Sequence, residues 1–139
     1  MNTDLAAQSA LDRLKQGGFD ALTDTDKTLA TTWLIEAGVT NDGFARFFAS
    51  SRGDVAFYAP TALRSIGANQ LAEIAAEANA VFAPLGPPRN HQTRAALVRA
   101  FDESTLHTFE TLDERYCACA EDTDLLLEGF LTRQATPVE

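Results

Sequence analysis

The sequence contains little cysteine and no long apolar run. Its only two cysteines, Cys117 and Cys119, stand too close together for an ordinary structural disulfide, which favours a reducing compartment. No apolar stretch approaches the roughly 20 residues that a transmembrane helix needs. The first residues mix acids with apolar side chains and lack a basic start followed by an apolar block, so they do not predict a signal peptide. We therefore expect a cytoplasmic protein with no membrane partner.

Positive charge is also scarce, because 11 lysines and arginines face 20 acidic residues and the formal net charge is −9. Residues 43–101 hold six arginines and three acids, whereas residues 102–139 hold ten acids and two arginines. Phosphate binding depends mainly on lysine and arginine, so direct binding to nucleic acid is disfavoured and a basic partner is favoured. We expect the central arginines to pair with the acidic ends of the chain rather than to form an anion site: Arg46, Arg52, Arg64, Arg89, Arg94 and Arg99.

Apolar spacing predicts an all-α protein, a single compact domain of about seven to eight short helices over residues 1–139. The clearest stripe begins after Asn69 and contains Leu71, Ile74, Ala75, Ala78 and Phe82. A proline-rich break at 84–88 follows, and Asn90 is expected to cap a helix whose apolar side includes Leu97, Val98 and Phe101. Residues 135–139 are predicted to be a frayed tail.

Two amphipathic helices are predicted before residue 40. The first carries Ala7, Leu11 and Leu14 on one face and ends at Gly17-Gly18. Either Thr23 or Thr25 is expected to cap the second. Its apolar face carries Leu29, Trp33 and Ala37, and Gly38 is its expected end. We interpret Trp33 as a core anchor, since a lone tryptophan at helical spacing usually packs in the interior.

The central segment, Asn41–Asn69, is where aromatic pairs, glycines and capping residues are densest. Phe44, Phe47 and Phe48 fall on one helical face, which predicts a buried helix. Asp54 is expected to cap the next helix and Asn69 a later one. Pro60 indicates either a kink or a helix that begins near Tyr58. The residues assigned a structural role are Trp33, Gly43, Phe44, Phe47, Phe48, Gly53, Asp54, Leu63, Ile66 and Gly67, the last as a left-handed C-cap.

Acidic residues dominate the pattern beyond Phe101. On a helix, Glu121, Asp124 and Glu128 align on one face, and Leu126, Leu127 and Phe130 occupy roughly the opposite face. Such carboxylates are about 4.5 to 6 Å apart along the axis, whereas phosphates on one DNA strand advance about 3.4 Å each. The candidate partner-binding residues are Glu110, Asp113, Glu114, Glu121, Asp124 and Glu128.

The sequence contains no pattern typical of a catalytic or metal site. The spacings of His91, His107, Cys117 and Cys119 match none of the usual zinc patterns, so we interpret both histidines as surface or satisfied residues. A phosphate-binding loop, a dinucleotide glycine pattern and a nucleophile elbow are all missing. We therefore expect no enzymatic activity, no cofactor and no bound metal.

The central segment resembles the DMP-nineteen-like family of bacterial DNA-mimic proteins, catalogued otherwise as a domain of unknown function. The matching motifs are Asn41-Asp42-Gly43-Phe44, Phe47-Phe48, Ser51-Arg52-Gly53-Asp54 and Ala62-Leu63-Arg64-Ser65-Ile66-Gly67-Ala68. A looser likeness continues through Phe82, Arg94 and Leu112-Asp113-Tyr116, so the resemblance covers about residues 30–133. Asp42 replaces the first glycine of the family motif, and Ser50 stands where asparagine is common.

The resemblance implies an all-helical fold and a role in transcription regulation as a DNA mimic. In such a protein an acidic surface, often completed across a homodimer, occupies the DNA-binding face of a transcription factor. Two alternatives remain at this point. One is an immunity- or antitoxin-like inhibitor of a basic toxin, and the other is an enzyme or ligand-binding domain with a pocket near Trp33, Arg46 and Tyr58.

Overall fold

Eight α-helices and two 3-10 segments make up most of residues 3–135, the part of the chain that the computed structural model describes. The elements are α1 (Thr3–Gly17), η1 (Phe19–Ala21), α2 (Asp24–Asp42), α3 (Phe44–Ala49), η2 (Ser51–Tyr58), α4 (Ala59–Ser65), α5 (Asn69–Ala80), α6 (His91–Ala100), α7 (Glu103–Ala118) and α8 (Thr123–Ala135). No strand occurs between residues 3 and 135. The all-α prediction is therefore confirmed, and most of the predicted tail lies outside the described residues.

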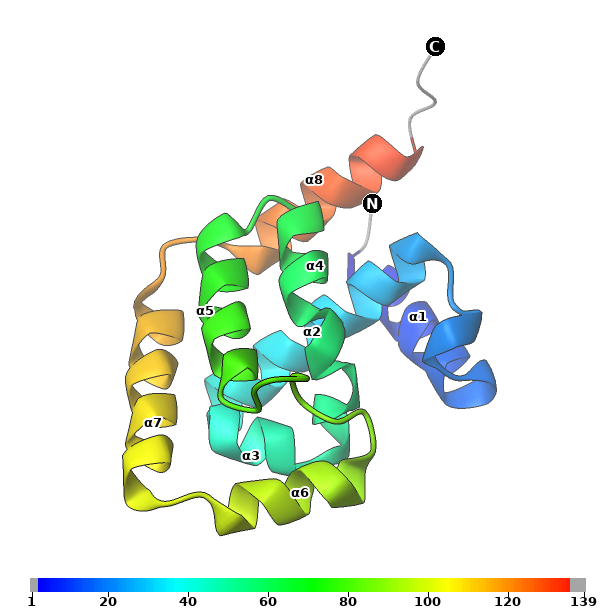
Figure 1. Ribbon diagram of the computed structural model, residues 1–139. Helices are drawn as coiled ribbons and strands as arrows, with labels where there is room; N and C mark the ends of the chain where they lie inside the picture. The colour runs from blue at the N-terminus through cyan, green and yellow to red at the C-terminus, as the bar shows by residue number, and fades with distance from the viewer. Residues whose placement is uncertain (1–2, 136–139) are drawn as a thin grey trace.

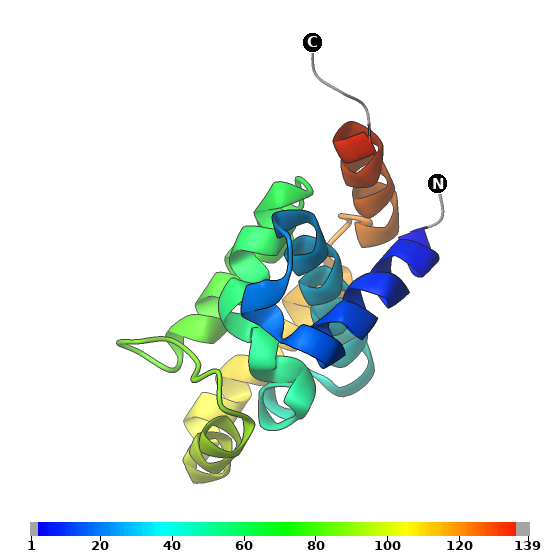
Figure 2. The same cartoon turned by 90° about the vertical axis from the view of Figure 1, so that its right-hand side faces the viewer.

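Helix α2 is the central element of the fold. It runs through the middle of the molecule and packs against α1 on one side and α4 on the other, with α4 and α5 side by side (Figures 1 and 2). Helices α3 and α6 lie together at one end, α7 lies along the outer edge, and α8 lies at the opposite end (Figure 1). Helix α2 also contacts α3, η2, α7 and α8, whereas α5 packs mainly on α4 and α6 mainly on α3.

Helix α2 begins as predicted but extends past its predicted end. The Thr23 hydroxyl accepts a hydrogen bond from the Asp26 amide at 3.1 Å and caps the helix. The helix continues through Gly38 to Asp42, and Gly43, with φ of 84°, ends it. The Phe47 ring packs directly on the backbone at position 38 and leaves no room for a side chain. A Cβ on Gly38 would lie 2.6 Å from Phe47 Cδ1. The glycine therefore permits ring packing and does not stop the helix.

Trp33 does not belong to the core, contrary to the prediction. Its side chain is only partly buried and lines a surface hollow between α2 and α8. The core positions of α2 are instead Leu29, Ala30, Ile35 and Val39.

The three phenylalanines of α3 form the centre of the core, as predicted. Phe44, Phe47 and Phe48 are each at most 1% exposed. The Phe48 ring centroid lies 4.8 Å from that of Phe82 and 5.4 Å from that of Phe109. Aromatic rings from α3, α7 and the turn after α5 therefore pack as one cluster in edge-on and tilted arrangements, which such rings prefer.

The rest of the central segment departs from the sequence interpretation at its caps. Asp54 lies inside η2 and caps no helix, and α5 begins at Asn69 without a cap from that side chain. Pro60 lies in the first turn of α4, where its missing N–H leaves no bond unmade, so the helix begins there and does not kink. Gly67, with φ of 88°, is the predicted C-cap, and Leu63 and Ile66 are buried before it.

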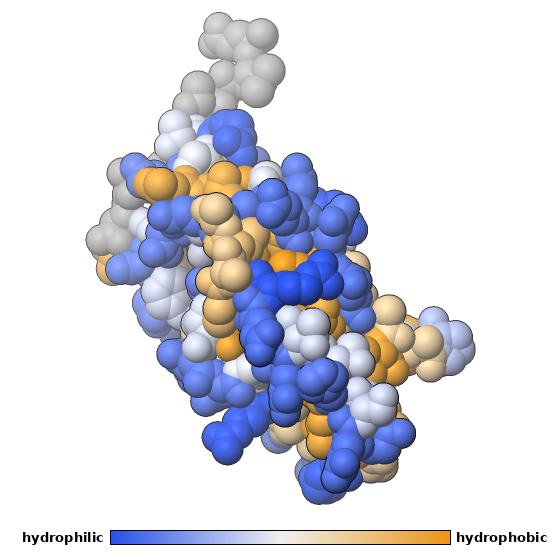
Figure 3. Space-filling view, turned by 90° about the vertical axis from the view of Figure 1, so that its left-hand side faces the viewer, coloured by the Kyte–Doolittle hydropathy of each residue, from blue (hydrophilic) through white to orange (hydrophobic). Residues whose placement is uncertain are grey.

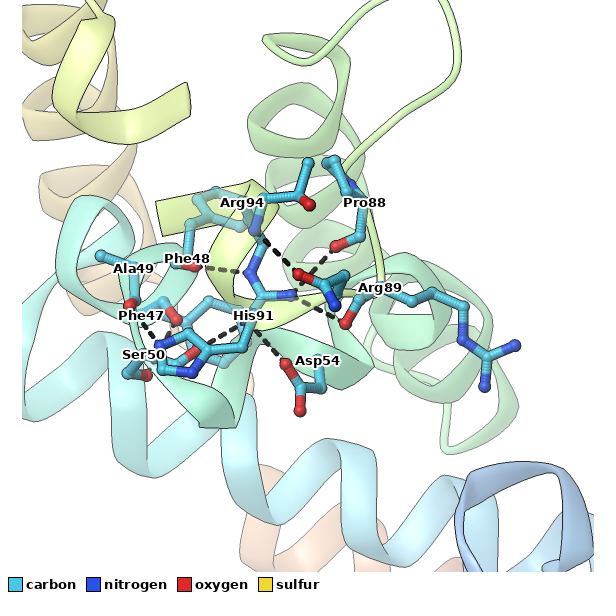
Figure 4. Close-up of polar contacts among 11 residues, drawn as sticks. Phe47, Phe48, Ala49, Ser50, Asp54, Pro88, Arg89, His91 and Arg94 are labelled. Atoms are coloured by element: carbon cyan, nitrogen blue, oxygen red, sulfur yellow. Dashed lines mark hydrogen bonds and ion pairs between the residues drawn. The ribbon is translucent and has the colours of Figure 1, made fainter. Parts of the chain in front are cut away.

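Arg94 is fully buried and connects α6 to the end of α3 (Figure 4). Its Nε donates to the Phe48 carbonyl, and its Nη2 donates to the Ser50 carbonyl at 2.6 Å and to Asp54 Oδ1 at 2.8 Å. Nη1 donates to the Pro88 and Arg89 carbonyls at 2.9 and 3.2 Å. These five bonds match the five N–H groups of a guanidinium.

The close approach of this guanidinium explains Gly53. A Cβ at Gly53 would lie 2.8 Å from Arg94 Nε and closer still to the Phe47 carbonyl oxygen. Asp54 follows directly and supplies the carboxylate that pairs with the buried cation. The Gly53-Asp54 pair is therefore required by Arg94 rather than by a helix cap.

Helix α6 begins as predicted but exposes one predicted apolar residue. The Asn90 side chain accepts a hydrogen bond from the Thr93 amide at 2.9 Å and caps the helix. Val98 and Phe101 pack against the core cluster. Leu97 is 40% exposed and does not pack against this cluster. The buried face of α6 is instead formed by Arg94 and Ala95.

Replacing Phe47 with alanine is expected to destabilise the fold by about 3 to 5 kcal/mol, because the buried ring leaves a cavity over Gly38. The measurement is the free energy of unfolding from urea denaturation. Leu125→Ala, at an exposed site on α8, is the control and should stay within about 0.5 kcal/mol of the parent. A loss below about 1 kcal/mol for Phe47→Ala would contradict the assignment of this ring to the core.

Arg94→Lys is expected to cost at least about 3 kcal/mol, because an ammonium group has three donors and cannot reach five acceptors. Arg99→Lys makes the same chemical change at an exposed position of the same helix. It should leave the stability nearly unchanged. The two variants are compared by the midpoint of urea denaturation. Equal midpoints would show that the guanidinium geometry is unimportant.

Candidate partner-binding surface

Four of the six predicted partner-binding acids are exposed in two helical pairs. Glu110 and Glu114 lie one turn apart on α7, and Asp124 and Glu128 lie one turn apart on α8. Hydrophilic residues cover most of the face seen from the α7 side, and hydrophobic residues form a patch between them in its upper middle (Figure 3). These four residues are called the acidic pairs below.

Asp113 is not part of that exposed set. Its Oδ1 accepts a hydrogen bond from the Phe44 amide at 2.7 Å, at the first residue of α3. Gly43, which precedes α3, has no side chain to cap the helix, and a Cβ there would lie 2.7 Å from Asp113 Oδ2. Asp113 therefore caps α3 from 69 residues away along the chain.

Burial raises the pKa of the Asp113 carboxyl. The hydrogen bond from the Phe44 amide lowers this pKa, and the nearby charges of Glu110 and Glu114 raise it further.

Glu121 has the same role at α5. It lies between α7 and α8, not on the α8 face as predicted, and its two oxygens accept from the Leu71 amide at 2.8 Å and the Gln70 amide at 3.2 Å. Ala68, at the N-cap position of α5, offers no side-chain bond. A carboxylate at a helix N-terminus also interacts favourably with the helix dipole. No sequence signal marks this long-range cap, because Asn69 offers a local capping side chain that the structure does not use.

The face that carries α5 and α7 also contains a cation. The Arg115 guanidinium binds Glu77 through two parallel bonds of 2.7 and 2.9 Å, and this pairing lowers the pKa of Glu77. His107 Nδ1 lies 3.7 Å from Glu110 Oε2 on an exposed part of α7. Some of the acids counted in the sequence are therefore already paired within the protein. A partner would meet fewer unpaired carboxylates than that count suggests.

A small hollow separates α2 from the first turn of α8. Thr32, Trp33, Glu36 and Ala37 line it on the α2 side. Thr123, Asp124 and Leu127 line it on the α8 side, and its volume is about 150 Å³. The expected pocket near Trp33, Arg46 and Tyr58 is not formed as one site, because Tyr58 lines a different hollow with Asp24 and Phe130 and Arg46 lines neither.

Glu36 is a polar residue that the sequence interpretation did not assign to a site. Its Oε2 accepts a hydrogen bond of 2.8 Å from the buried Tyr116 hydroxyl. Burial and the negative charge of Glu36 both raise the pKa of Tyr116. Glu36 therefore joins α2 to α7 and also lines the hollow.

The described residues bring together no group of three or more histidine, cysteine or acidic side chains that is arranged to hold a metal ion. Cys117 is exposed and Cys119 is partly buried, and both are free thiols. None of the helices between residues 3 and 135 combines the length and the apolarity needed to cross a membrane.

Asp113→Asn is expected to gain stability relative to the parent as pH rises from about 4 to 7. The unfolded chain loses the Asp113 proton near 3.8, before the folded chain does. Rising pH therefore lowers the free energy of unfolding of the parent between that pH and the raised pKa of the folded chain. Above the raised pKa this loss is complete. Asparagine keeps an oxygen for the Phe44 amide and removes the charge.

Asp102→Asn serves as the control of opposite sign. Asp102 caps α7 through the Thr105 amide at 2.8 Å, and this bond lowers its pKa. Its stabilisation is present above 3.8 and is lost as pH falls below it, so the asparagine variant should lose stability relative to the parent as pH rises towards 3.8 and keep a constant difference above that pH. Melting temperatures from about pH 2 to pH 7 measure both variants, and parallel curves for the two would contradict the assignment.

Comparison with known proteins places the chain in a family. A family model described as DMP19-like protein matches residues 20–134. Neither a curated protein nor a solved structure matches the chain. The matched range contains the core phenylalanines, the Gly53-Asp54 pair and Arg94, and it reaches from η1 to the last turn of α8. This chain belongs to the DMP19-like protein family.

Proposed function

We propose that the protein is a non-enzymatic DNA mimic of the cytoplasm, and that its acidic pairs bind the DNA-binding surface of a basic protein. The observation that supports this proposal is the exposure of Glu110, Glu114, Asp124 and Glu128 on two helices. Two of the six acids first chosen from the sequence, Asp113 and Glu121, hold the fold together through backbone bonds. The proposed binding surface therefore consists of the other four.

The spacing of the acidic pairs fits the proposal. Residues four apart on a helix are separated by about 6 Å along the axis. Alternate phosphates on one DNA strand are about 6.8 Å apart, twice the single step of about 3.4 Å. Each acidic pair thus offers two negative charges at nearly the interval of every second phosphate, so a lysine or arginine pair that spans this interval would meet both.

The charge of the protein favours association with a basic partner. A net charge of −9 attracts a positively charged protein over a distance set by ionic strength, about 8 Å at physiological salt. Exposed charges act mainly on the rate of association and on specificity. Binding through the acidic pairs should therefore weaken steeply as salt is added.

The variant Glu110→Gln, Glu114→Gln, Asp124→Asn, Glu128→Gln tests this function. Immobilised parent protein should recover a basic nucleic-acid-binding protein, and duplex DNA should compete with that capture. The fourfold variant should bind the recovered protein at least about tenfold more weakly, because four charges of the interface are removed. Affinities are measured by surface plasmon resonance at several salt concentrations.

The matched control removes the same number of charges from another part of the chain, with Asp4, Asp12, Asp20 and Asp24 replaced by asparagine. It should retain nearly the parent affinity. Equal losses in the two variants would show that only net charge matters. Capture that persists in high salt, or binding that survives loss of the acidic pairs, contradicts DNA mimicry, and capture of a toxin without a DNA-binding surface favours the inhibitor alternative. Light scattering of the complex determines whether a homodimer presents the surface.

A further inference from the structure

The hollow between α2 and α8 has the size of a single side chain. Its volume is about 150 Å³, well below the roughly 300 to 1,000 Å³ of pockets that hold metabolites and drug-sized ligands. A cavity of about 150 Å³ is known to accommodate a molecule of benzene size. The hollow is open at the rim, where Asp124 is exposed and Trp33 is only partly buried. It therefore fits a short apolar chain that enters from solvent and ends in a small polar group.

Thr32 supplies an unused hydrogen-bonding group at this hollow. Its side chain is fully buried, and its Oγ1 has no hydrogen-bond partner within residues 3–135. Most buried polar groups are paired, because an unpaired one loses its bonds to water without replacement. Thr31 has the same defect on the neighbouring position of α2 but does not line the hollow. A rotation of the Thr32 side chain that turns Oγ1 towards the hollow would let a donor group seated there satisfy it.

The charges around the hollow favour a cation. Glu36 and Asp124 are the two charged side chains that line it, and both are acids. Glu36 uses Oε2 for the Tyr116 hydroxyl, which leaves accepting capacity on the carboxylate. The indole of Trp33 adds the aromatic face that best attracts an ammonium or guanidinium group.

The N-terminus of α8 opposes this preference but is offset. A helix start carries about half a positive charge, which repels cations. Asp122 Oδ1 accepts hydrogen bonds from the Asp124 amide at 3.0 Å and the Leu125 amide at 3.2 Å. These two amides, which would attract an anion, are therefore already paired with a carboxylate, and the charged side chains that line the hollow are both acids.

We propose that this hollow seats one lysine or arginine side chain of the basic partner, with its stem against Trp33 and Leu127 and its charged end between Glu36 and Asp124. The inference rests on the proposed function and adds a specific anchor to it. Asp124 belongs both to the hollow and to the acidic pairs, so the anchor adjoins the proposed surface. A buried side chain in a pocket is the usual form of a binding hot spot.

The experiment uses N-acetyl-arginine methylamide as the probe and its neutral isostere N-acetyl-citrulline methylamide as the comparison. The chain has one tryptophan, so the single indole N–H resonance in the NMR spectrum of the full-length protein reports on the hollow. The arginine probe should shift this resonance saturably, with a dissociation constant on the order of millimolar. The citrulline probe should bind at least about tenfold more weakly, because it lacks the charge.

Thr32→Val and Thr31→Val form a matched pair of variants. Both remove an unpartnered buried hydroxyl of similar shape, so both should fold with at least the parent stability. Thr32→Val should weaken binding of the arginine probe about three- to tenfold, the loss of one hydrogen bond. Thr31→Val should leave it unchanged. Ala37→Leu, which fills the hollow, should abolish the shift.

The outcomes separate this inference from the proposed function. Equal binding of the arginine and citrulline probes, no shift with either, or equal losses from both threonine variants would each overturn the cation site. If the arginine probe fails while the acidic pairs still capture a basic protein, the proposed function stands without this anchor. If the arginine probe binds and no salt-sensitive capture occurs, the cation site stands and DNA mimicry is rejected.

Discussion

The guanidinium of Arg94 holds the junction where α3 ends, η2 begins and the proline-rich segment reaches α6. Backbone carbonyls at such a junction have no helical partner and must be satisfied in another way. One rigid fork satisfies four of them and pairs with Asp54. The phenylalanines of α3 can then pack against α2 and α7 without leaving buried polar groups unpaired, and the close approach accounts for Gly53. The aromatic core and the buried cation are thus parts of one arrangement.

The acids of the C-terminal third have two different tasks. Asp113 and Glu121 cap helices that begin without a capping side chain of their own, and each reaches across the fold to do so. The acidic pairs face solvent on the same stretch of chain. Folding therefore uses part of the negative charge and leaves the rest for a partner. The net charge alone overstates the surface, and neutralising all six acids together would confuse loss of stability with loss of binding.

Helix α2 connects the core to the proposed anchor. Its buried side holds Gly38 against Phe47, while Thr32, Trp33 and Glu36 line the hollow beside α8. The Glu36 carboxylate of α2 accepts a hydrogen bond from Tyr116 of α7. Helix α2 therefore contacts α7, which carries one acidic pair, and lines the hollow together with α8, which carries the other. A partner side chain in the hollow would meet a helix face that is already formed, which lowers the cost of ordering on binding.

The sequence by itself determined the helical class, the buried face of Phe44, Phe47 and Phe48, the local cap at Asn90 and the left-handed stop at Gly67, and it narrowed the cap of α2 to Thr23 or Thr25. Each of these depends on residues within one or two turns, where spacing and side-chain chemistry decide the outcome. Tertiary structure decided the role of Gly38, the partly buried position of Trp33, the buried fork of Arg94 and the long-range caps from Asp113 and Glu121. In each of these cases the partner lies on another element, and no local pattern specifies a contact that exists only after the helices have packed.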